Sequence, residues 1–107
     1  MPAHLGVPDG ATVDTEGGYW VALPYGDNSG GVGRFTADGK LDIYIETPVR
    51  VPTMVAFGGP RMSTLYITSL NDPHFTHGAD AGALSGDLFA VETPFCGVPE
   101  TLFPYRR

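Results

Sequence analysis

Short stretches in which hydrophobic and polar residues alternate, separated by turn-forming residues, run through this chain. The clearest apolar run, Tyr19–Leu23, is rich in strand-forming side chains and predicts a strand buried on both faces. Asp38-Gly39 lies between Val32–Thr36 and Lys40–Glu46, which predicts a hairpin. Alternation within Lys40–Glu46 predicts a strand at the outer edge of a sheet, with one apolar and one polar face. The expected apolar face carries Leu41, Ile43 and Ile45, and the expected polar face carries Asp42, Tyr44 and Glu46.

The same pattern restarts in the second half of the chain. Val7-Pro8 recurs as Val51-Pro52, 44 positions later, and Thr64–Thr68 matches Tyr19–Leu23 in position and character. A repeat of this length with four short strands per unit is typical of a propeller blade. We therefore predict an all-β fold of about two four-stranded antiparallel blades. The alternative all-β architecture is a sandwich of seven or eight strands.

The predicted blades divide the chain at about residue 48. The first spans about residues 5–48 and the second about residues 49–107, where residues 95–107 supply a fourth, poorer strand interrupted by Pro99 and Pro104. Trp20 and Tyr66 are expected to pack between blades. Propellers typically close with about four to eight blades, so two blades leave open sheet edges. We expect these edges to be covered by more chain upstream or by further copies of this chain.

The amino-acid composition argues against two classes of binding partner, nucleic acids and membranes. The 107 residues carry a formal net charge of −6 with only six Lys and Arg, so we expect no nucleic-acid partner. No segment approaches the roughly 18 apolar residues of a membrane span, so no membrane partner is expected. Cys96 is the single cysteine, which excludes an intrachain disulfide and fits a cytoplasmic location.

An ordered set of short motifs runs over roughly residues 6–103. In the first repeat it consists of Pro8-Asp9-Gly10, Glu16-Gly17, Trp20-Val21-Ala22 and Gly33-Arg34-Phe35. In the second repeat it consists of Pro48-Val49-Arg50, Ala56-Phe57-Gly58-Gly59 and Leu65-Tyr66-Ile67-Thr68-Ser69. Taken together, these motifs resemble the gluconolactonase and senescence-marker-protein-30 family. The resemblance implies a six-bladed β-propeller that hydrolyses lactones of sugars, of which this chain is the C-terminal portion.

The resemblance also implies a divalent metal ion, calcium or zinc, at one end of the central channel. In that family its ligands are a Glu, an Asn and the Asp of the Pro-Asp-Gly segment. Only the last maps onto this sequence, at Asp9, which is implied as a metal ligand and candidate catalytic base. Taken without the resemblance, Asp9-Gly10 indicates only a turn. Thr53 and Met54 hold the matching place in the second repeat and are candidate substrate-pocket residues; the alternative is packing where the strand begins.

One further segment carries metal-ligating residue types. Residues 71–80 contain His74 and His77 between Asp72 and Asp80, a set that could hold zinc. Pro73 and Gly78 favour an irregular loop over a rigid one, so a solvated loop is the competing interpretation.

Two classes of function follow. The first is a metal-dependent sugar-lactone hydrolase of which this chain is a part, inactive by itself, with a small-molecule sugar lactone as substrate. The second is a non-catalytic propeller fragment that acts as an interaction module or assembles as a homo-oligomeric ring.

Overall fold

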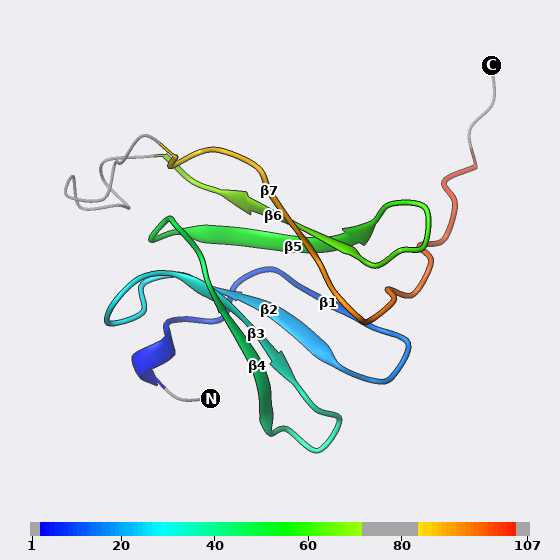
Figure 1. The fold of residues 1–107 in the computed structure, drawn as a ribbon, viewed down its shortest axis with the longest axis horizontal. Helices are drawn as coiled ribbons and strands as arrows, with labels where there is room; N and C mark the ends of the chain where they lie inside the picture. Colours follow the sequence, from blue (N-terminus) through cyan, green and yellow to red (C-terminus); the bar gives the residue numbers. More distant parts are fainter. Residues whose placement is uncertain (1–2, 72–83, 105–107) are drawn as a thin grey trace.

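The computed structural model describes residues 3–71 and 84–104 and contains two antiparallel sheets (Figure 1). A short 3-10 helix, η1 (Ala3–Leu5), precedes the strands. The first sheet has the order β1-β2-β3-β4, and its strands are β1 (Ala11–Val13), β2 (Tyr19–Leu23), β3 (Gly31–Phe35) and β4 (Leu41–Glu46). The second has the order β5-β6-β7, and its strands are β5 (Pro52–Gly58), β6 (Thr64–Ser69) and β7 (Phe89–Glu92).

Each sheet takes its strands in chain order, without a crossover between the sheets. This meander is the topology of propeller blades, whereas sandwiches interleave strands of the two sheets through Greek-key connections. The prediction of two consecutive antiparallel blade-like sheets is therefore confirmed. Within the described residues, no helix is long and apolar enough to span a bilayer.

A β-bulge in the hairpin of β3 and β4 corrects one expectation. Arg34 pairs with Ile43 but Phe35 pairs with Leu41, so Asp42 is the extra residue. Leu41 therefore lies on the Phe35 side of the sheet, and Asp42 reaches the Arg34 guanidinium at 2.7 Å on the other side. The strict alternation predicted for residues 40–46 is wrong at these two positions, because one bulged residue reverses the facing of everything beyond it.

The second sheet differs from the predicted four-stranded blade. In residues 84–104 no strand follows β7, and the expected fourth strand over 95–107 is replaced there by an isolated bridge between Gly97 and Asp14 of the first sheet. The Thr15 N–H donates to the Cys96 carbonyl at 2.9 Å, and the Gly97 N–H donates to the Met62 carbonyl at 2.7 Å. The segment thus crosses from β7 to the first sheet and joins the two sheets at this end.

The main core lies between the two sheets. From the first sheet it takes the buried side chains of Trp20, Ala22 and Val32, and from the second those of Val55, Leu65 and Ile67. Trp20 is 1% exposed and meets the rings of Phe57 and Phe95 edge-on, with centroid distances of 5.6 and 5.7 Å. The expectation that Trp20 packs between sheets is confirmed. Tyr66 instead lies on the face turned away from the first sheet and is 38% exposed.

A smaller core covers part of the opposite face of the first sheet. Val21, Leu23 and Phe35 are buried there, with Leu5 of η1 and Ala11 packed against them. The N-terminal segment is fixed in this place by its backbone, since the Val7 N–H donates to the Pro24 carbonyl at 2.8 Å. This arrangement positions the residues that precede β1, where the candidate site lies.

Candidate functional site

Asp9 lies two residues before the start of β1, and its side chain is exposed. Its backbone is fixed, because the Asp9 N–H donates to the Ala22 carbonyl at 2.9 Å and the next residue, Gly10, donates to the Thr53 carbonyl at 2.9 Å. The β1–β2 pairing therefore continues past the end of β1 and holds the Asp9 carboxylate at the edge where the first sheet meets β5.

Gly10 allows the two sheets to approach closely at this edge. A Cβ at Gly10 would lie 2.2 Å from the Met54 sulfur, 2.6 Å from the Thr53 carbonyl oxygen and 2.8 Å from the Met54 Cα. Only a residue without a side chain fits there. The motif Asp9-Gly10 is thus a place where the first sheet contacts β5, as well as a bend in the chain.

Thr53 and Met54 lie at the same end of the molecule as Asp9. Thr53 is half-buried and its hydroxyl shares a hydrogen bond of 2.8 Å with the Thr68 hydroxyl, while Met54 is 45% exposed. The fold therefore brings the three residues singled out in the sequence to one edge. Their roles as ligand, base and pocket residues stay predictions.

The described residues supply only part of a cation site. They contain no group of three or more His, Cys, Asp or Glu side chains arranged to hold a metal ion. A carboxylate such as that of Asp9 is a hard oxygen ligand of the kind calcium prefers, but calcium takes about 6–8 such oxygens. The donor chemistry of Asp9 fits one ligand position, and the other ligands would have to come from other chain segments. The possible ligands Asp72, His74, His77 and Asp80 lie outside the described residues.

A buried ionic cluster lies apart from this edge and was not anticipated from the sequence. The Asp14 carboxylate accepts hydrogen bonds from Trp20 Nε1 at 2.8 Å and from Arg34 Nε at 2.8 Å, and it also accepts the backbone N–H groups of Glu16 and Gly18, each at 2.9 Å. All five residues belong to the first sheet or its β1–β2 turn. Because these groups form hydrogen bonds with one another, the cluster is assigned a structural role.

The titration of the cluster follows from these contacts. Burial acts to raise the pKa of Asp14, but the hydrogen bonds from Arg34, Trp20 and the two backbone N–H groups outweigh it and lower the pKa to about 2. The hydrogen bond to Asp14 raises the pKa of Arg34, against the opposing effect of burial. The Arg34 guanidinium also lies 4.0 Å from the centroid of the Phe95 ring, a cation–π contact. The pair is therefore ionised at neutral pH.

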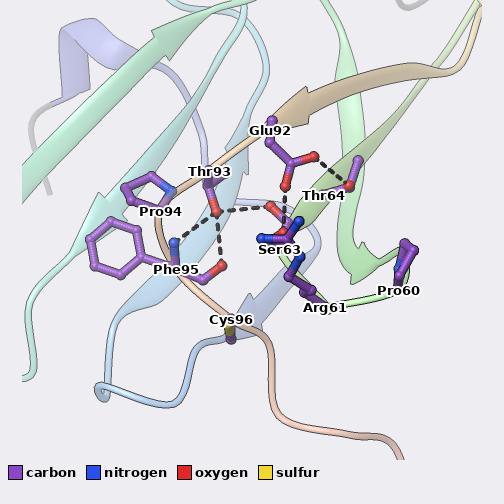
Figure 2. Close-up of a pocket in the computed structure, with 9 residues that line it drawn as sticks. All are labelled: Pro60, Arg61, Ser63, Thr64, Glu92, Thr93, Pro94, Phe95 and Cys96. Atoms are coloured by element: carbon purple, nitrogen blue, oxygen red, sulfur yellow. Dashed lines mark hydrogen bonds between the residues drawn. The ribbon is translucent and has the colours of Figure 1, made fainter.

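A pocket of about 610 Å³ opens at the other end of the second sheet, between the β5–β6 turn and the segment that follows β7 (Figure 2). Glu92 is held there by the hydroxyls of Ser63 and Thr64, and the first of these contacts is the main cause that lowers the pKa of Glu92. Gly10 lies against Thr53 and Met54, near the start of β5, whereas the pocket lies beyond the end of β5 at Gly58. The length of β5 therefore separates the pocket from Asp9. Asp9, Thr53 and Met54 do not line it.

Comparison with known proteins identifies the family. Residues 1–71 match the family described as the SMP-30/Gluconolactonase/LRE-like region. The chain is 43% identical over 98 residues to the 6-deoxy-6-sulfogluconolactonase of Pseudomonas putida, covering 92% of this chain and 33% of that protein. It is 36% identical over 103 residues to pentonolactonase XacC of Haloferax volcanii, covering 92% of this chain and 34% of that protein.

A solved structure agrees with this result. The calcium-binding protein regucalcin of Agrobacterium tumefaciens superposes with a TM-score of 0.78 at 30% identity, over 94% of this chain and 33% of that one. The two sheets are thus blades of a regucalcin-like propeller. The chain belongs to the SMP-30/gluconolactonase/LRE-like family. It spans about a third of the length of the relatives it matches.

Proposed function

We propose that this chain is the part of a sugar-lactone hydrolase that contributes Asp9 to the site where the lactone carbonyl is attacked. The observation that carries the proposal is the exposed side chain of Asp9 on a fixed backbone, in which Asp9 bonds to Ala22 of β2 and its neighbour Gly10 bonds to Thr53 of β5. Membership of a family that includes lactonases supports the reaction class. The substrate class that follows is a small sugar lactone.

The chemistry requires a polarised carbonyl and a nucleophilic water. A divalent metal ion, calcium or zinc, supplies both when bound, since it polarises the carbonyl oxygen and lowers the pKa of a bound water. Asp9 would hold the ion through one carboxylate oxygen and accept the proton of the attacking water. The regucalcin relative is a calcium-binding protein, which favours calcium. The remaining ligands would lie in the parts of the propeller that this chain does not include.

The proposal can be tested in a chimera. Residues 1–107 replace the matching third of the Pseudomonas putida lactonase, and lactone hydrolysis is followed as acid release with calcium or zinc present. We expect activity in the chimera and a loss of about 100-fold or more in the Asp9→Asn variant. Glu100→Gln, which removes an exposed carboxylate elsewhere, is the matched control. A folded, metal-loaded chimera that retains activity without the Asp9 carboxylate would refute the role of this residue.

The isolated chain should be inactive, because one carboxylate does not make a cation site. The exposed outer faces of the two sheets also favour a second candidate function, in which the chain is an interaction module or assembles as a ring of copies. Tyr44 and Tyr66, on the outer faces of the two sheets, are 36% and 38% exposed. Assembly predicts a native mass near three times 11.3 kDa, and a monomer in solution removes that form of the alternative. As part of the proposed function, we also expect the first blade to span about residues 5–48 and the second about residues 49–107. We likewise propose that the protein is cytoplasmic.

A further inference from the structure

Tyr25 adopts a backbone conformation that its side chain disfavours. Its φ is +64°, and in the part of the chain that the structure describes only Met62 shares this property among non-glycine residues. Such a conformation costs roughly 1–2 kcal/mol for a residue with a Cβ, and a glycine would avoid the cost. Strained residues of this kind cluster at ligand sites. Met62 lies in the β5–β6 turn, at the opposite end of the second sheet from Asp9, so Tyr25 is the one to explain.

The backbone around Tyr25 is fixed from two directions. The Tyr25 N–H donates to the Arg50 carbonyl at 3.2 Å, and the preceding Pro24 carbonyl accepts the Val7 N–H at 2.8 Å. The following residue is packed equally closely, since a Cβ at Gly26 would lie 2.4 Å from the Ser29 carbonyl oxygen. The surrounding loop therefore imposes the strained conformation.

Tyr25 lies at the same end of the molecule as Asp9. The pairing that joins Asp9 to Ala22 continues along the chain as the hydrogen bond between Val7 and Pro24, next to Tyr25. On the other flank, the Gly10 N–H donates to the carbonyl of Thr53, the second residue of β5, and the Tyr25 N–H donates to the carbonyl of Arg50, two residues before β5. The loop between β2 and β3 thus borders the edge that carries Asp9.

The side chains of Tyr25 and Arg50 form a pair suited to a sugar. The guanidinium carbon of Arg50 lies 5.8 Å from the centroid of the half-buried Tyr25 ring. An aromatic ring offers an apolar platform for the C–H face of a sugar, and a guanidinium offers several donors in a fixed plane to hydroxyl or anionic oxygens. A rigid ring backed by a cation orients a ligand with little loss of side-chain entropy.

We propose that Tyr25, backed by Arg50, is a specificity-determining residue for the lactone. It contacts the part of the sugar remote from the carbonyl, whereas Asp9 acts at the carbonyl. The ligand class is an aldonolactone whose far end carries acceptor oxygens, either hydroxyl or oxyanion. This inference rests on the proposed lactonase function, and it explains why a tyrosine stands where glycine would be less strained.

Two variants separate a binding role from a structural one. Tyr25→Gly removes the ring and relieves the strain, and Tyr25→Phe keeps the ring without the hydroxyl. In the chimera described above we expect Tyr25→Gly to raise KM about 10-fold, the equivalent of one lost contact, with kcat changed less than about threefold. Tyr25→Phe should keep KM within about threefold of the parent value. In residues 1–107 alone, Tyr25→Gly should leave the melting temperature unchanged or higher.

Comparison of two substrates assigns the far-end group. KM is measured for gluconolactone and for its 6-phosphate in the parent chimera and in its Arg50→Gln variant. If Arg50 binds an oxyanion, the substitution should raise KM more for the phosphate than for gluconolactone. If Arg50 binds hydroxyls, it should raise KM equally for both substrates. Asn28→Ala, exposed in the same loop, is the control and should leave KM unchanged. An unchanged KM in Tyr25→Gly overturns this inference alone, provided that Asp9→Asn still abolishes activity. A folded chimera without activity overturns both proposals.

Discussion

The side chains of Asp14 and Arg34, 20 residues apart in sequence, form an ion pair of 2.8 Å in which the carboxylate is fully buried. Asp14 directly follows β1, and Arg34 lies in β3 on the face that meets the second sheet, against Phe95. A buried pair of this kind is costly to break, because the remaining charge has no solvent to compensate it.

Removal of the Asp14 charge is expected to weaken the fold severely. We expect Asp14→Asn to lower the free energy of unfolding by about 3 kcal/mol, since it leaves the Arg34 guanidinium without its buried partner. Asp42→Asn is the matched control: its side chain is 39% exposed, and the expected loss is about 1 kcal/mol or less. Urea unfolding followed by the fluorescence of Trp20, the single tryptophan, measures both. Equal losses in the two variants would contradict this assignment.

The same carboxyl group predicts a pH dependence of stability. Its pKa is about 2 in the folded protein against an ordinary 3.8, so the folded state favours the ionised form. The contribution, about 2 kcal/mol, is fully present above about pH 4 and is lost as the pH falls from 4 through 2. Urea midpoints should therefore fall between pH 4 and pH 2 in the parent chain. The slope should be smaller in Asp14→Asn, and an identical slope would assign the acid sensitivity to other groups.

Phe95 is expected to be needed for the environment of Trp20. Its ring contacts Trp20 edge-on and lies under the Arg34 guanidinium, so Phe95→Ala removes packing from both. We expect a loss of about 3 kcal/mol in unfolding free energy, together with a red shift of the Trp20 emission as water reaches the indole. Phe103→Ala should change neither, because Phe103 is 84% exposed. An unshifted emission in Phe95→Ala would show that the indole stays covered without this ring.

Gly10→Ala tests the close approach of the two sheets. The new Cβ would meet the Thr53 carbonyl and the Met54 backbone, which cannot move aside as a side chain would. We expect a loss of about 2 kcal/mol in unfolding free energy. Shortening of the neighbour in the double variant with Met54→Ala should restore little of it, because the backbone clash remains. Full recovery in the double variant would show that only the methionine sulfur restricts the position.

Much of the fold was predictable because it depends on local patterns. The run Tyr19–Leu23 coincides with β2, and Asp38-Gly39 forms the turn of the β3–β4 hairpin. The 44-residue repeat gave the correct order of two consecutive sheets. The bulge at Asp42 was not predictable in the same way, since it depends on a pairing between β3 and β4 that the alternation of one strand does not contain.

The features that the sequence did not reveal, in the loop beside the site and in the buried ionic cluster, depend on contacts between distant segments. Tyr25 belongs to a loop rich in turn-forming residues, and only its φ and its hydrogen bond to Arg50 distinguish it from its neighbours. Asp14 ends the stretch Ala11-Thr12-Val13-Asp14, in which apolar and polar residues alternate, and nothing in that stretch indicates its partner Arg34, 20 positions away. Only the family resemblance indicated a functional role for Asp9, because Asp9-Gly10 taken by itself is also typical of an ordinary turn.

The crossing of residues 95–97 to the first sheet has a consequence for how the chain unfolds. Its backbone bonds attach the end of the second blade to the β1–β2 turn and to the β5–β6 turn at once. Neither sheet can detach without breaking these bonds and uncovering the indole of Trp20. Heating should accordingly unfold both blades in a single cooperative step. The amide exchange rates of Thr15 and Gly97 should therefore change in parallel as conditions change the stability of the fold.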